Sequence, residues 1–261
     1  MVRDILISGG FVLGTVLLTW VIYFGMRLFV RDRVAPDTKD LAGSVIFRVA
    51  ALHGLILGLV FAQELLDYNE IRADLVREAT AVADIYNDMN RYGGDEVAAV
   101  QLALSDYVRQ VVTVEWDRLG QQGRLSAEGW VFRETFYQSI LNLSPNSPRQ
   151  TDLRSHMVQN SQLIATLRQQ RENTAIYHMG ALFWIAALGG LVFVALPYFT
   201  FTPTPLHVAL LSIYGAFSGL IMLMIYAFSN PFSPPGALAP TAFERLMETE
   251  IGVGPRRSPD L

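Results

Sequence analysis

The sequence predicts an all-α, polytopic membrane protein with four transmembrane helices and a helical extramembrane bundle between helices two and three. Hydrophobic residues make up 51% of the 261 residues and charged residues only 17%, with a mean hydropathy of +0.30. A soluble domain of this size has about a quarter of its residues charged. The charges concentrate in residues 67–178, and long apolar stretches lie on both sides of that region.

Residues 1–66 hold the first two predicted transmembrane helices. Residues 5–26 carry no charge, and at about 1.5 Å per residue they cross a hydrocarbon core of roughly 30 Å. Arginines follow directly instead of a small-residue cleavage site, so we interpret the stretch as a retained helix and not as a signal peptide. The second helix, residues 49–66, has a weaker pattern because it contains His53 and Glu64.

Residues 179–228 predict a transmembrane hairpin. Its helices, 179–199 and 206–228, are uncharged and are joined by a short loop of threonine and proline. Residues 229–261 form a proline-rich C-terminal segment and tail, because proline lacks the donor that a continuing helix needs. Within it we expect a short amphipathic helix at the membrane surface over residues 243–251, and a disordered tail from Gly252.

Residues 67–178 predict a bundle of antiparallel helices in water. Apolar residues recur at helical spacing after residue 67, so the second helix should continue until Gly93 and Gly94. Further helices are expected over residues 95–119, after a cap at Ser126, and over residues 151–177. Arg168 and Arg171 are expected to meet the acids Glu70, Asp74 and Glu78 across the bundle, as structural contacts.

Small residues at four-residue spacing predict where the transmembrane helices pack, because in lipid they let two backbones approach closely. The alternative is that glycine is simply common in such helices. The candidate packing residues in helices two and four are Ala50, Gly54, Gly58, Ala62, Gly215 and Gly219.

The opposite face of helix two is the candidate pore lining. Its residues project within roughly 100° and change from apolar to acidic along the helix. In an oligomer, the apolar positions would form rings that exclude ions by dewetting, followed by acidic rings. Alternatively, the histidine hydrogen-bonds a neighbouring helix and the acids mark the membrane boundary. The residues are His53, Ile56, Val60, Gln63, Glu64 and Asp67, with Val49 beside them.

Enzymatic, cofactor, metal and nucleic-acid functions have no support in the sequence. The chain has no cysteine, and its four histidines are far apart and in no metal-binding spacing. No phosphate-binding loop or nucleophile motif is present. A net charge of −4 provides no basic field for nucleic acid.

Two short runs resemble the bestrophin-like family of bacterial membrane proteins. They are Leu-Leu-Asp-Tyr-Asn-Glu-Ile-Arg at residues 65–72, continuing to Arg-Glu-Ala at 77–79, and Asn230-Pro231-Phe232. Bestrophins proper are pentameric ion channels whose second helix lines the pore, so the resemblance implies a homo-oligomer that conducts inorganic ions. In the bestrophin turn a glycine follows the phenylalanine, where this chain has Ser233, and no acidic cluster follows. A calcium clasp is therefore not expected.

The expected environment is the lipid bilayer of the bacterial inner (plasma) membrane. More basic residues lie on the side of the termini and the helical domain, which places these in the cytoplasm, although the loop after the first helix is also basic. Two functions remain open: a homo-oligomeric ion channel with helix two at the pore, or a non-conducting scaffold or sensor whose helical domain binds a partner or ligand.

Overall fold

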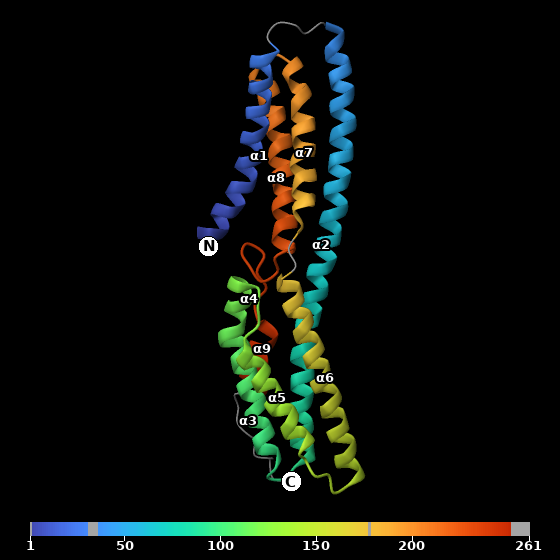
Figure 1. Ribbon diagram of the computed structural model, residues 1–261, viewed down its shortest axis with the longest axis vertical. Coiled ribbons are helices and arrows are strands. Elements are labelled where there is room, and N and C mark those ends of the chain that lie inside the picture. The colour runs from blue at the N-terminus through green and yellow to red at the C-terminus, as the bar shows by residue number, and fades with distance from the viewer. Residues whose placement is uncertain (1, 31–35, 177–178, 252–261) are drawn as a thin grey trace. The chain divides into compact units, whose positions relative to one another are not determined.

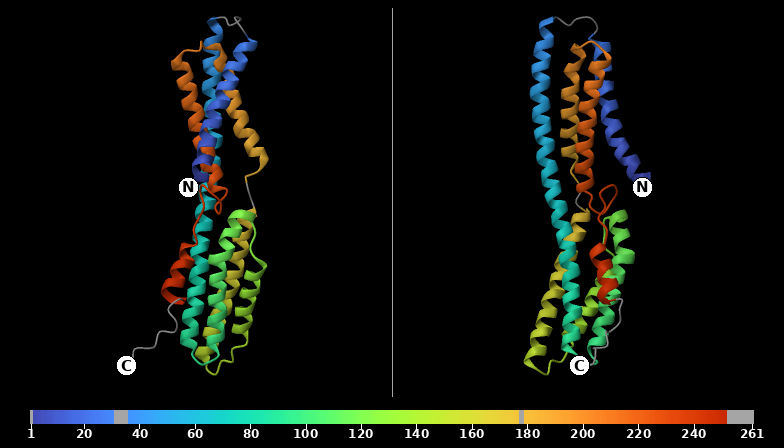
Figure 2. Two further views of the ribbon diagram at one scale, coloured as in Figure 1. Left: turned by 90° about the vertical axis from the view of Figure 1, so that its left-hand side faces the viewer. Right: turned by 180° about the vertical axis from the view of Figure 1, so that it is seen from behind.

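The computed structural model describes residues 2–30, 36–176 and 179–251, and in these residues it contains helices and no strand. Four helices are long and apolar enough to cross a membrane by length and composition. The chain divides into two compact units (Figures 1 and 2). The membrane unit comprises residues 1–68, 178–230 and 234–236, and the helical unit comprises residues 69–177, 231–233 and 237–261.

The membrane unit is built on α1 (Val2–Phe29), the first part of α2 (Pro36–Tyr92), α7 (Ala181–Ala195) and α8 (Pro205–Phe228). Helix α7 ends in a 3-10 turn, Leu196–Thr200. Helices α1 and α8 lie side by side in all views (Figures 1 and 2). Leu57 of α2 is buried in a cluster with Ala187 of α7 and with Met222 and Ile225 of α8.

Glycines bring α8 close to α1. The Thr15 hydroxyl of α1 donates a hydrogen bond to the Gly215 carbonyl over 2.8 Å. A Cβ at Gly219 would meet the Thr15 hydroxyl and would lie 2.8 Å from the Phe11 carbonyl oxygen. Gly215 and Gly219 therefore act as small packing residues, as their spacing predicts.

The helical unit contains the rest of α2, then α3 (Val97–Gln110), α4 (Trp116–Gln122), α5 (Ala127–Leu141) and α6 (Pro148–Ile176). A π-helical turn, Val111–Glu115, joins α3 to α4. Gly93 and Gly94 follow α2 with positive φ, which glycine adopts without steric cost. Ser126 caps α5 by accepting a hydrogen bond from the Gly129 amide.

The end of the chain differs from its predicted place. Helix α9 (Thr241–Leu246) and the following π turn, Met247–Ile251, belong to the helical unit, where Phe243 and Leu246 are 0% and 5% exposed. The Trp116 indole also donates a hydrogen bond to the Leu238 carbonyl over 2.8 Å. This corrects the expectation of a helix at the membrane surface, because its apolar side chains are covered by the chain's own helices. The tail from Gly252 lies outside the described residues.

The contact between α1 and α8 gives a test of the membrane unit. Gly219→Ala should destabilise the protein by about 1–3 kcal/mol, because the added methyl group meets backbone atoms of α1 that cannot move aside. The matched control is Gly14→Ala in α1, where a Cβ would meet nothing within 4 Å. Thermal unfolding in detergent measures both. Equal melting temperatures for the two variants would contradict the packing described here.

Candidate functional site

His53 ties α2 to two other helices of the membrane unit. It is only 4% exposed, with Nδ1 2.6 Å from the Tyr214 hydroxyl and Nε2 2.9 Å from the Ala187 carbonyl oxygen. A carbonyl oxygen only accepts, so in the neutral ring Nε2 donates and Nδ1 accepts from Tyr214. Any Cβ at Gly190 would overlap the ring. Within one chain His53 therefore has the alternative role, that of a hydrogen-bonding residue between helices.

The other predicted pore residues differ in how far the chain's own helices cover them. Val60 is partly buried and packs against the Leu57 cluster, and Glu64 is also partly buried. Ile56 is 48% exposed, and Gln63 and Asp67 are exposed as well. The structure therefore does not keep the six residues on one free face. The two exposed polar residues of this set contact each other: the Gln63 amide donates to the Asp67 carboxylate over 2.8 Å.

The stripe of small residues on α2 does not pack against the chain's own helices. Gly54, Gly58 and Ala62 are exposed, Ala50 is partly so, and a Cβ at either glycine would meet nothing within 4 Å. The prediction that this stripe packs against protein is thus not met within one chain. The reason is that α2 uses the sector of His53 and Leu57 for those contacts, and the stripe lies on a different side.

A buried cluster of charges was only partly predicted. Glu115, at the end of the π turn, pairs with Arg168 of α6, whose Nη1 lies 2.6 Å from Oε2. The amide and hydroxyl of Ser126 also donate to Oε1 of Glu115, over 3.1 and 2.8 Å. Gly129 lies against this ion pair, where a Cβ would overlap both partners. The carboxylate therefore has a donor for each oxygen in a site that excludes water.

Arg171 joins this pair to a second buried glutamate. Its two terminal nitrogens lie 3.1 Å from Glu78 Oε2 and 3.4 Å from Glu115 Oε2. The Tyr107 hydroxyl donates to Glu78 over 2.7 Å. Burial, followed by the nearby charge of Glu78, raises the pKa of Tyr107, so the phenol keeps its proton and remains a donor. The cluster thus links α2, α3, the π turn and α6.

The cluster has a structural role. Each of its charged side chains is at most 1% exposed, and two carboxylates balance two guanidinium groups. The remaining unpartnered polar atoms are the Nε atoms of Arg168 and Arg171. Of the acids Glu70, Asp74 and Glu78 that are expected opposite the two arginines, Glu78 pairs with Arg171, and Glu115 is an additional, unexpected partner. A signal was present: Glu115 continues the apolar positions Leu104 and Val111 at helical spacing, where a charge needs a buried partner.

No metal centre is formed in the described parts of the chain, where no group of three histidine or acidic side chains is placed to hold an ion. His156 lies 2.5 Å from the Asp88 carboxylate, and Asp88 also pairs with Arg91. His207, in the first turn of α8, hydrogen-bonds through Nδ1 to the carbonyl of Thr202 in the loop before that helix. The fourth histidine, His178, lies outside the described residues.

Four apolar helices and a separate helical unit define a polytopic α-helical membrane protein. The family model of the Bestrophin-like domain matches residues 9–243. The chain therefore belongs to the bestrophin-like family. No protein among the curated ones matches it.

The charge cluster gives a test in the helical unit. Glu115→Gln should destabilise the protein by about 3–5 kcal/mol, because it leaves the buried Arg168 without a compensating charge. The control is Glu134→Gln, since the Glu134 side chain is 53% exposed and water hydrates its carboxylate. Circular dichroism during heating in detergent measures both. A small and equal loss of helix stability in the two variants would rule out the role given to Glu115.

Proposed function

We propose that the protein is a homo-oligomeric ion channel with α2 around the pore. The observation that supports this most is that α2 contacts the other helices of the membrane unit on one side only. One sector, with His53 and Leu57, holds α7 and α8, while most of the remaining surface contacts nothing in the chain. Membership of the bestrophin-like family supports the same proposal, and the resemblance to bestrophins implies a pentamer.

The sector of α2 that contacts α7 and α8 determines which residues of α2 face the axis. In a ring with α2 innermost, each chain's other helices lie outside, so the axis faces the opposite side of α2. At about 100° per residue, Leu55, Ala62 and Leu66 lie roughly 180° from the sector of His53 and Leu57. Leu55 and Leu66 are 58% and 65% exposed. An apolar constriction of this kind blocks ions by dewetting until it widens.

The two flanks of that sector are suited to neighbouring subunits. Gly54 and Gly58 lie on one flank, and Ile56 and Gln63 lie on the other. Glycines let a second helix approach closely in lipid, so the flank with Gly54 receives the Ile56 flank of the next subunit. A head-to-tail contact of this kind closes into a ring when its rotation angle divides a full turn. Gln63 lies on the Ile56 flank and donates to Asp67 one turn further on, so both polar residues lie at this contact between subunits and not on the axis.

The proposed environment is the bacterial inner membrane, with termini and helical unit in the cytoplasm. The support is the greater number of basic residues on that side of the predicted spans. The conducted species are inorganic ions.

Cysteine substitution tests the pore, because the chain has no cysteine of its own. In liposomes, a charged thiol reagent should abolish ion flux through Leu55→Cys, because the attached charge lies in the constriction. Leu13→Cys on α1, which is 63% exposed and contacts lipid in this proposal, is the control and should keep its flux. Ile56→Cys should be affected less than Leu55→Cys.

Two outcomes would contradict the proposal in different ways. A verified oligomer without flux would favour the non-conducting scaffold or sensor. Block of Ile56→Cys with Leu55→Cys unaffected would retain the channel and place another face of α2 at the axis.

A further inference from the structure

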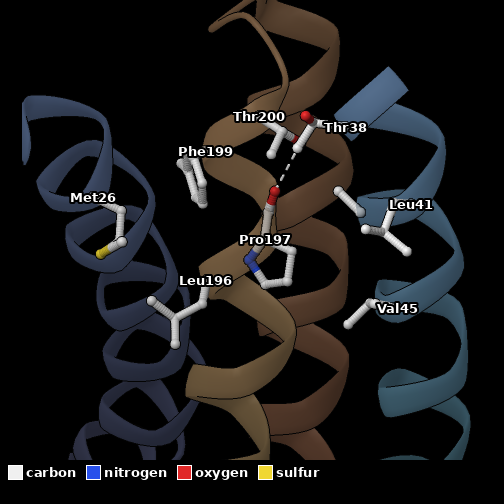
Figure 3. Close-up of a pocket in the computed structure, with 9 residues that line it drawn as sticks. Met26, Thr38, Leu41, Val45, Leu196, Pro197, Phe199 and Thr200 are labelled. Atoms are coloured by element: carbon white, nitrogen blue, oxygen red, sulfur yellow. Dashed lines mark hydrogen bonds between the residues drawn. The ribbon is translucent and has the colours of Figure 1, made fainter. Parts of the chain in front are cut away.

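The membrane unit contains an apolar groove of about 370 Å³ where α1 ends and α2 begins. Side chains from α1, α2 and the 3-10 turn after α7 face this common space (Figure 3). Its wall is formed mainly by Met26, Leu41, Ala42, Val45, Leu196 and Phe199.

Local sequence explains why this space is open and why it is apolar. Pro197 lies in the 3-10 turn that ends α7, and Ala42 presents only a methyl group. Ala42 is 7% exposed, so it lies at the base of the groove. The Thr200 hydroxyl donates to the Pro197 carbonyl over 2.9 Å, which leaves it no need of a ligand. A polar ligand would lose its hydration here without gaining hydrogen bonds.

Two cationic residues, one of them followed by the acidic Asp40, are sequence neighbours of residues that line the groove. Arg27 follows Met26, and Lys39 follows Thr38, which also lines the groove. The Arg27 guanidinium lies beside the 3-10 turn, where it donates to the Phe201 carbonyl over 3.0 Å. Neither residue forms an ion pair with another residue that the structure describes. Basic residues beside an apolar space at a membrane-helix end match a lipid phosphate.

We propose that this groove binds one acyl chain of an anionic phospholipid, with the lipid phosphate held by Arg27 and Lys39. The flexible acyl chain matches the apolar wall of the groove. The negatively charged phosphate pairs with the cations Arg27 and Lys39. The site is distinct from the proposed pore, because Ala42 and Val45 precede the stretch of α2 assigned to the axis.

Mass spectrometry of the intact purified protein tests this site by counting phosphatidylglycerol and phosphatidylethanolamine that remain bound during detergent washing. The unmodified chain should retain phosphatidylglycerol in preference to phosphatidylethanolamine. Ala42→Trp fills the base of the groove and should reduce retention by about tenfold. Phe47→Trp is the control, because Phe47 is 77% exposed on α2 and does not line the groove. Lys39→Gln should remove the preference for the anionic lipid.

A second variant tests the groove in case Ala42→Trp does not fold. Leu41 lines the groove but is 66% exposed, so Leu41→Trp can obstruct the opening without crowding the base. Equal lipid retention by Leu41→Trp, Ala42→Trp and Phe47→Trp would overturn the proposal, as would equal retention of the two lipids by the unmodified chain. Because the count needs no ion flux, it is independent of channel activity.

Discussion

The membrane unit depends on how α2 is held by its own chain. His53 donates to α7 and accepts from α8, and Leu57 packs against both helices. In lipid, where apolar surfaces gain little by meeting, such hydrogen bonds and close contacts determine which sector of a helix faces its partners. Once His53 and Leu57 are turned inward, Gly54 and Leu55 must face away from the chain. The free surface of α2 is therefore a consequence of one buried histidine and its neighbours.

The same helix is fixed in the helical unit by charges. Glu78 of α2 pairs with Arg171 of α6, and Arg171 reaches Glu115 of the π turn. Burying these groups costs several kcal/mol per ion, so the cluster contributes less to stability than its number of contacts suggests. Its larger effect is on specificity, because any shift of α2 against α6 would separate buried opposite charges. Helix α2, which lines the proposed pore, is therefore fixed in register against α6 in the helical unit.

The fold was largely predictable because hydropathy and helical period are properties of the local sequence. Four apolar stretches, the continuation of α2 to Gly93 and the cap at Ser126 could all be located in this way. The long-range contacts could not. Tyr214 and Ala187, which bind His53, are more than 130 residues away, and no local pattern indicates that they meet it. The glycine stripe shows the same limit, since spacing shows that residues share a face but not whether the chain's own helices or another chain cover it.

The charge cluster shows this limit as well. Glu115 lies at helical spacing from the buried Leu104 and Val111, which indicates burial, but its partners Arg168 and Arg171 are more than 50 residues away and no local pattern identifies them. The C-terminal helix α9 was placed at the membrane because its pattern is amphipathic. An amphipathic pattern fits equally well against Trp116 in the helical unit, where Phe243 is buried.

The proposed channel requires that α2 from several copies surrounds one shared axis. Imaging of the purified protein in lipid nanodiscs tests this directly. We expect a symmetric ring in which α2 is the helix nearest the axis and Leu55 points into the central opening, with α7 and α8 farther out. A single chain, or a ring with α1 or α8 nearest the axis and the glycine stripe facing lipid, would contradict it.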